Sequence, residues 1–235
     1  MSANGTDTGA SAARAKVLDS IRTGLGVSGK ESDRRAAVTA RLLGHKANLV
    51  PARASESRPE LMKRFRTMLE GQSVTVVEAA SVEELPQAIA AYLRGRNLPL
   101  RVRLGQDPLW ALLPWDREPA LERLPGRAEA TDTAGLSHAA GGAAETGTLI
   151  FTSGPDNPTT LNFLPETHIV VVKEADIVGS YEQIWSRVRD QYGEGTMPRT
   201  VNFISGPSRT GDIEQVIVMG AHGPRNMMVV VVKEG

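Results

Sequence analysis

Glycine-rich segments in the second half of the sequence hold several side chains that could do acid–base or anion-binding chemistry. The first spans residues 139–148 and reads AAGGAAETGT, with Glu145 as its only ionisable group. Small residues let a ligand approach closely, and a carboxylate there could act as a base, a nucleophile or a hydrogen-bond acceptor, with Thr146 and Gly147 as binding groups beside it. The alternative is a tight turn in which Glu145 accepts hydrogen bonds from nearby amides. The spacing does not decide between the two.

The second segment, residues 205–214, reads SGPSRTGDIE and directly follows a predicted strand. A strand followed by glycine, hydroxyl and arginine residues, and then by a helix from Asp212, can present amides and a guanidinium to one anion. The segment has neither the Gly-Lys-Ser/Thr ending of a nucleotide-binding loop nor the three-glycine dinucleotide fingerprint. In the alternative interpretation, Asp212 caps the helix and Arg209 pairs with a carboxylate. The candidate anion-binding residues are Gly206, Ser208, Arg209, Thr210, Gly211 and Asp212.

His222 stands in a third segment, GAHGP, over residues 220–224. Its imidazole could donate to a ligand or exchange a proton near neutral pH, and the alternative is a turn histidine with one satisfied nitrogen. The other histidines, at positions 45, 138 and 168, have no companion at metal-ligand spacing. The sequence therefore predicts no metal site.

Short β-rich runs alternate with helical patterns from residue 73 onward, which favours a parallel sheet. The C-terminal strands are near-continuous apolar runs, typical of strands covered on both faces. The sequence predicts an α/β fold, a three-layer sandwich with a mostly parallel sheet, preceded by N-terminal helices. Ligand-binding loops of such sheets lie beyond the carboxyl ends of the strands, so we expect the three segments to meet at that edge. The predicted strands are 73–78, 100–104, 148–152, 168–173, 200–204 and 227–232; the predicted helices are 17–25, 33–43, 57–71, 81–94 and 180–192; residues 106–113 are expected to form a helix or turn, and 114–126 irregular surface.

The overall composition is that of an ordinary soluble globular protein. The 235 residues are 40% hydrophobic, and 27 Lys and Arg balance 27 Asp and Glu. A chain without net charge lacks the general electrostatic attraction that drives binding to nucleic acids or anionic membranes, so we expect neither partner. The sequence contains no cysteine, which excludes a disulfide, a thiol nucleophile and a thiolate-bound iron-sulfur cluster within it. The apolar run at 227–232 is far shorter than the roughly 20 residues of a membrane span, and no export signal is visible, so we expect a cytoplasmic protein.

Three longer stretches carry a resemblance to a known family. They are AETGTLIF at 144–151, TSGPDNPTTLNFLPETHIVVV at 152–172 and FISGPSRTGDIEQVIVMGAHGP at 203–224. In this order and spacing they closely resemble the LUD-domain family, and the likeness covers residues 57–233. The stretch 135–143 departs from the family pattern, with His138 and Gly142 where other small or apolar residues are expected. We predict a disordered start over 1–13, a helical extension over 14–56 and a LUD α/β domain over 57–235.

The resemblance implies a fold similar to the ribose-phosphate isomerase and coenzyme A transferase group, and a role in oxidising L-lactate to pyruvate beside iron-sulfur partner proteins. Because this chain has no cysteine, iron-sulfur clusters are expected only in the partner subunits, and no cofactor is expected in this chain.

Our hypothesis for the site is that the three segments line one cleft. Arg209 and the amides near it would hold a small carboxylate or a phosphorylated ligand, and Glu145 and His222 are the catalytic candidates. The alternative is a stand-alone small-molecule enzyme of the sugar-phosphate isomerase or coenzyme A transferase kind, in which a glutamate could act as nucleophile. The four side chains expected in the cleft are Glu145, Arg209, Asp212 and His222.

Overall fold

A computed structural model describes the backbone over residues 8–193, 195–213 and 216–233, and the side chains over 11–193, 195–210 and 219–233. The chain divides into two compact units, Met1–Asn48 and Leu49–Gly235. Within the described residues, no helix combines the length and the apolar character that crossing a membrane requires.

The first unit contains two helices, α1 (Thr8–Leu25) and α2 (Ser32–Gly44). Helix α1 begins inside the range 1–13 that we expected to be disordered, and residues 1–7 of that range lie outside the described part. None of the described side chains between residues 11 and 48 is buried. The apolar side chains from which these helices were predicted are therefore not buried.

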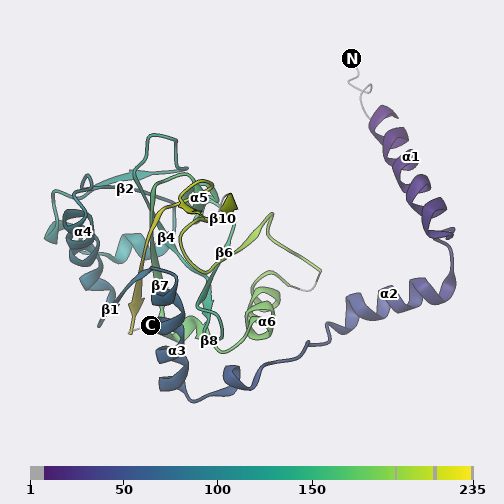
Figure 1. Cartoon of the computed structure of the whole chain (residues 1–235), viewed down its shortest axis with the longest axis horizontal. Coiled ribbons are helices and arrows are strands. Elements are labelled where there is room, and N and C mark those ends of the chain that lie inside the picture. Colours follow the sequence, from purple (N-terminus) through teal and green to yellow (C-terminus); the bar gives the residue numbers. More distant parts are fainter. Residues whose placement is uncertain (1–7, 194, 214–215, 234–235) are drawn as a thin grey trace. The chain divides into compact units, whose positions relative to one another are not determined.

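A six-stranded sheet forms the centre of the second unit (Figure 1). Every neighbouring pair of its strands is parallel. Two adjacent strands of this sheet, at 226–232 and 167–173, are the β-branched runs that the sequence predicted, and they match the prediction within one residue. In sheet order the strands are β1 (Thr75–Ala79), β12 (Asn226–Val232), β7 (Thr167–Lys173), β4 (Ala134–His138), β2 (Arg101–Leu104) and β3 (Glu122–Pro125).

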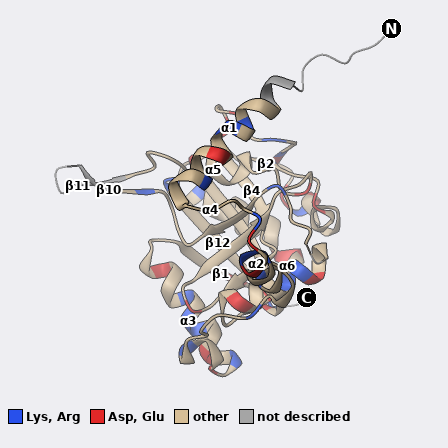
Figure 2. Cartoon of the chain, turned by 90° about the vertical axis from the view of Figure 1, so that its right-hand side faces the viewer, with Lys and Arg blue, Asp and Glu red and all other residues tan. Residues whose placement is uncertain are grey.

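A smaller, four-stranded sheet accompanies the first, and the sequence did not predict it as a separate sheet. Two of its pairings are antiparallel and one is parallel. A separate antiparallel hairpin projects away from both sheets (Figure 2). The smaller sheet has the order β8 (Ile177–Val178), β5 (Gly141–Ala143), β6 (Thr148–Thr152) and β9 (Val201–Ile204), and the hairpin consists of β10 (Arg209–Ile213) and β11 (Val216–Met219).

Capping side chains begin two of the helices in this unit. The amide of Ser57 donates to the Glu60 carboxylate at 3.0 Å where α3 starts, and the amide of Ser180 donates to Gln183 Oε1 at 3.0 Å where α6 starts. The helices are α3 (Arg58–Gly71), α4 (Leu85–Gly95), α5 (Thr160–Phe163) and α6 (Tyr181–Tyr192), and the short 3-10 turns are Ala52–Ser55, Val82–Glu84, Pro108–Leu112, Trp115–Arg117 and Glu174–Asp176.

The large sheet is covered on both faces. Along β7, Ile169 and Val171 pack on the side of α4, whereas Val170 and Val172 pack on the side of α3 and the smaller sheet. Helix α6 packs its Ile184 on the smaller sheet in a third cluster. The α/β class with a mostly parallel sheet flanked by helices is therefore confirmed.

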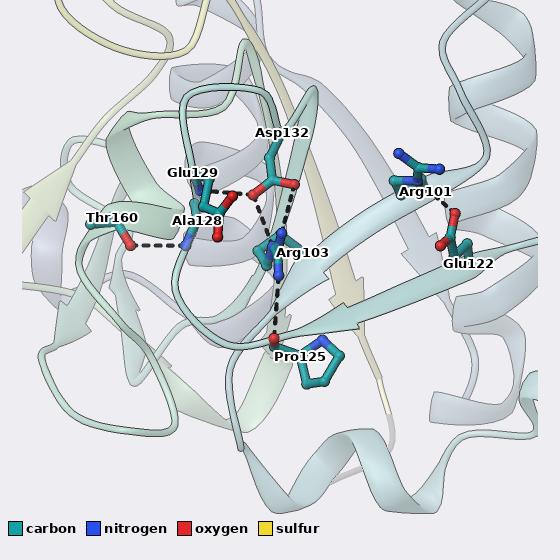
Figure 3. Close-up of polar contacts among 8 residues, drawn as sticks. All are labelled: Arg101, Arg103, Glu122, Pro125, Ala128, Glu129, Asp132 and Thr160. Atoms are coloured by element: carbon teal, nitrogen blue, oxygen red, sulfur yellow. Dashed lines mark hydrogen bonds and ion pairs between the residues drawn. The ribbon is translucent and has the colours of Figure 1, made fainter.

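An ion pair ties the edge of the large sheet to the loop before β4 (Figure 3). Arg103 on β2 donates from Nε and Nη2 to the two oxygens of Asp132, at 2.8 and 3.2 Å, and the amide of Glu129 donates to the same carboxylate at 2.8 Å. The Asp132 side chain is 6% exposed. The neighbouring pair of Arg101 and Glu122, at 2.6 Å, has both side chains more than half exposed.

Charged groups elsewhere are mixed in sign. Lys and Arg alternate with Asp and Glu over the face shown in Figure 2, in agreement with the net charge of zero. Many of these groups form exposed pairs, such as Lys233 with Glu78 at 2.8 Å. Exposed pairs of this kind contribute little to stability.

Candidate functional site

Two of the three predicted segments meet in a cavity of about 290 Å³, which we call the amino-end cavity. It lies at the amino-terminal ends of β7 and β12, close to α5 and to the start of β10 (Figure 1). Our prediction had placed the segments at the carboxyl ends. The reason for the difference is that the strand before residue 205 is β9, which belongs to the smaller sheet. The predicted residues that line the cavity are Gly206, Ser208, Arg209 and His222.

Backbone hydrogen bonds hold the two segments together. The amide of Ser208 donates to the carbonyl of Pro224 at 2.7 Å, and the amide of Gly220 donates to the carbonyl of Ser208 at 2.9 Å. The amide of His222 donates to Ser208 Oγ at 3.3 Å. The Ser208 amide is thus occupied by the fold itself and is not open to an anion, contrary to our expectation.

Arg209 provides the positive charge of this cavity. Its side chain is exposed, and its Nη2 donates to Ser73 Oγ at 2.8 Å. A guanidinium has five N–H donors, so most of them are left for a carboxylate or a phosphate. The alternative we considered, in which Arg209 pairs with a protein carboxylate, is not seen among the described residues.

The segment after Arg209 is a strand and not the helix we predicted. Residues 209–213 form β10, which pairs with β11 across an antiparallel ladder. No helix N-terminus therefore faces the cavity at this point. Thr210 and Gly211 lie in β10, and Thr210 is not among the described residues that line the cavity. The side chain of Asp212 lies outside the described residues.

A buried histidine forms the floor of the amino-end cavity. The Oγ of Ser137 donates to Asn162 Oδ1 at 3.2 Å, so Nε2–H of His168 donates in turn to Ser137 Oγ at 3.1 Å. The ring packs against Phe151, with 5.4 Å between ring centroids. Burial lowers the pKa of His168 to about 3, because no water solvates the cation there. His168 is therefore neutral at physiological pH.

Glu145 does not reach this cavity. Its Oε1 accepts a hydrogen bond from the amide of Tyr181, the first residue of α6, at 2.9 Å, and its own amide donates to the carbonyl of Gly179 at 3.1 Å. The side chain is 6% exposed. A carboxylate at a helix start is favoured by the free amides and the helix dipole. This arrangement is the capping turn that we had kept as the alternative interpretation.

The residues after Glu145 also have structural partners. Gly147 has φ of +64°, and a Cβ there would lie 2.7 Å from Cβ of Met68 on α3. Thr146 Oγ1 donates to the hydroxyl of Tyr181 at 2.8 Å. That hydroxyl also lies 2.6 Å from Thr148 Oγ1, which is 2.7 Å from Ser205 Oγ at the amino-end cavity. A chain of hydroxyl groups thus runs from the Glu145 turn to the cavity.

A larger cavity, of about 480 Å³, lies at the opposite ends of the same strands, and we call it the carboxyl-end cavity. Its lining includes Asp107, three residues beyond β2, and the last residues of β4 and β7, His138 and Lys173. The sequence analysis did not select these residues. Strand β4 was not predicted, so His138 had no neighbour in the sequence that would have placed it beside Asp107. The one available signal was that Lys173 ends a predicted parallel strand.

Among the described residues, no three His, Asp or Glu side chains come together as a metal site requires.

Comparisons with known proteins decide the family. The family model described as LUD domain matches residues 62–232. The chain belongs to the LUD domain family. A relative from Deinococcus radiodurans, named Lactate utilization protein C, is 36% identical over 189 residues, which cover 77% of this chain and 84% of that protein. A relative of the same name from a Geobacillus strain is 37% identical over 92 residues, and the match spans 38% of its length.

A solved structure agrees with the fold of the LUD domain. The crystal structure of a DUF162 family protein from Deinococcus radiodurans matches with a TM-score of 0.58 and 28% sequence identity, over 75% of this chain and 99% of that chain. The LUD match begins at residue 62, inside α3. Both cavities therefore lie in the part of the chain that defines the family, and α1 and α2 precede it.

Proposed function

We propose that this chain is a component of a lactate-utilisation system that takes part in the oxidation of L-lactate to pyruvate, together with iron-sulfur partner subunits. The observation that carries the proposal is the relation to the Deinococcus radiodurans protein named Lactate utilization protein C, which extends over 77% of this chain. Several other relatives carry the same name, although the chain spans only about two fifths of their length.

The chemistry of the reaction explains why partners are needed. Oxidation of L-lactate to pyruvate removes two electrons and two protons from the substrate, and an acceptor has to take up the electrons. The sequence contains no cysteine, so a cluster held by thiolates belongs to another subunit in this proposal. The role left to this chain is to bind a ligand, to hold the partners together, or both.

In the amino-end cavity, Arg209 is the residue we propose to hold an anion. Its guanidinium is exposed and makes a single hydrogen bond, to Ser73, among the described residues. Ser208 and His222 lie beside it on the same cavity wall. A small carboxylate or the phosphate of a larger ligand fits this donor set, because a guanidinium can bind either through two parallel hydrogen bonds.

Growth on L-lactate tests the proposed function. Deletion of the gene from its host is expected to abolish growth on L-lactate and to leave growth on glucose unchanged. The intact gene should restore growth, and an Arg209→Ala variant should not. Arg127→Ala is the matched control, because Arg127 is exposed and lines neither cavity. Normal growth of the deletion strain on L-lactate would refute the proposed function.

Affinity purification from lactate-grown cells tests the partners. The tagged chain should recover cysteine-rich iron-sulfur proteins, and a mixture reconstituted from them should oxidise L-lactate. A chain that is recovered alone and turns over a phosphosugar or a coenzyme A ester would instead identify a stand-alone enzyme.

A further inference from the structure

The carboxyl-end cavity has the position at which parallel α/β sheets bind ligands. Parallel strands direct the loops after them to one edge, and three adjacent strands, β2, β4 and β7, contribute residues here. The volume of about 480 Å³ lies within the range of small-molecule sites. Residues 152–157 form another wall, which is joined to the loop after β2 by a hydrogen bond of 3.1 Å from the Gln106 amide to the Pro155 carbonyl.

Within the described part of the chain, one polar side chain of this cavity has no hydrogen-bond partner, and one cation forms no ion pair. Asn157 is 6% exposed, and neither its amide nitrogen nor its amide oxygen is hydrogen-bonded. Lys173 makes no ion pair with any described residue. A buried polar group without a partner costs free energy, so the retention of Asn157 in a cavity is typical of a group that binds a ligand.

A histidine and an aspartate form a pair in the same cavity. His138 Nδ1 lies 2.9 Å from Asp107 Oδ2, and Asp107 also accepts from the amide of Leu109 at 2.8 Å. Burial alone would raise the pKa of Asp107, but these hydrogen bonds and the nearby charge of Lys173 lower it overall. Asp107 is thus ionised and accepts Nδ1–H, which leaves His138 Nε2 without a partner among the described residues.

The charges around the cavity select the kind of anion. Lys173 offers one positive charge, whereas Asp107, Asp156 and Asp176 also line the cavity. Asp176 is paired with Arg187 at 2.9 Å, and Asp156 is exposed. The carboxylates disfavour a phosphate with two negative charges, and Lys173 is the one lysine or arginine among the described lining residues that could hold a ligand with a single negative charge.

We propose that the carboxyl-end cavity is a binding site for a small hydroxycarboxylate with one negative charge. Lys173 holds the carboxylate, and His138 Nε2, oriented by Asp107, accepts the hydrogen bond from the hydroxyl group. The Asn157 amide binds the remaining oxygen. The choice of a hydroxycarboxylate rests on the proposed function, whereas the position of the site rests on the geometry alone.

Titration of the purified full-length chain with L-lactate near neutral pH tests this site. Binding in the millimolar range is expected for so small a ligand. Lys173→Met should weaken it at least about tenfold, since a charge-assisted hydrogen bond is lost. Lys233→Met is the matched control, because Lys233 follows β12 at the same edge of the sheet outside the cavity, and it should bind like the wild type. Arg127→Ala should also retain binding, because Arg127 is exposed and lines neither cavity.

Two further ligands test the chemistry without any variant. Propionate has the same carboxylate but no hydroxyl group, so it should bind several-fold more weakly than L-lactate. Inorganic phosphate should bind more weakly still, because of the surrounding aspartates. Equal binding of propionate and L-lactate would refute the role of His138, and tighter binding of phosphate would refute the ligand class.

The failure of this site can be told apart from the failure of the proposed function. A chain that is required for growth on L-lactate but does not bind L-lactate overturns the site alone. Binding that survives in Lys173→Met and is lost in Arg209→Ala also overturns it. Thermal unfolding of each variant shows whether the loss of binding reflects loss of the fold.

Discussion

The two cavities lie at opposite ends of one strand, yet their polar groups are used in different ways. His168 near the start of β7 faces the amino-end cavity, and Lys173 at its end lines the carboxyl-end cavity, about 17 Å away at the usual rise of a strand. At the amino end, His168, Ser137 and Asn162 bond to one another, and Nδ1 of His168 and Nδ2 of Asn162 have no partner among the described residues. At the carboxyl end, the Asn157 side chain has no hydrogen bond and Lys173 has no ion pair within the described part of the protein. The three side chains at the amino end therefore connect β4, β7 and α5, whereas the Asn157 side chain makes no hydrogen bond to the described part of the fold.

The ion pair of Arg103 with Asp132, which lies just before β4, should show the largest effect on stability. Asp132→Ala leaves Arg103 without its nearly buried carboxylate, and the free energy of unfolding should fall by about 3 kcal/mol. Glu122→Ala removes the exposed partner of Arg101 two residues away on the same strand and should cost less than about 1 kcal/mol. Urea unfolding of both variants measures the difference. Equal losses would mean that burial does not distinguish the two pairs.

The buried histidine should make the amino end sensitive to acid. Because the pKa of His168 is about 3 in the folded protein and about 6.5 in an unfolded chain, the unfolded state binds one more proton between these values. Stability should therefore rise with pH over this range, and about 2 kcal/mol should be lost between about pH 7.5 and about pH 5. His168→Gln should remove this contribution from the pH dependence of unfolding. An unchanged slope in the variant would show that His168 can be protonated within the folded protein.

Two substitutions with small expected effects on stability, one at each cavity, compare the two ends of β7 most directly. Ser137→Ala leaves the donor of His168 and the acceptor of Asn162 unpaired, and it should destabilise the protein by about 1 kcal/mol. Lys173→Met removes no ion pair among the described residues and should change stability by less than about 0.5 kcal/mol. A marked destabilisation by Lys173→Met would give that side chain a structural role and would remove the contrast between the two ends.

The fold could be predicted further than the site, for physical reasons. The runs at 168–173 and 227–232 are continuous and β-branched, and they became β7 and β12 with little change in their ends. Strand β4, with the sequence AGLSH, has no β-branched residue and was not predicted. Residues 114–126 were expected to be irregular, but they contain β3, which is held by pairing to β2.

The errors at the site came from contacts between distant residues. The TGD sequence at 210–212 resembles a helix start, yet this segment pairs with β11 as a strand. The spacing of residues in the sequence did not reveal that the Ser208 amide would donate to the Pro224 carbonyl. Nor did it reveal that Glu145 would cap the start of α6. His138 and Asp107 are 31 residues apart and become neighbours only because β2 and β4 pair. A single sequence carries no record of such pairings.

Gly105, the residue after β2, sets a limit on how the carboxyl-end cavity can change. A Cβ at this position would lie 2.0 Å from the carbonyl oxygen of Asp156 and 2.8 Å from Cδ of Pro158. Even the smallest side chain would thus displace residues 153–158, which include Asn157. Redesign of this protein for other ligands can vary Lys173 or His138, but residue 105 has to remain glycine.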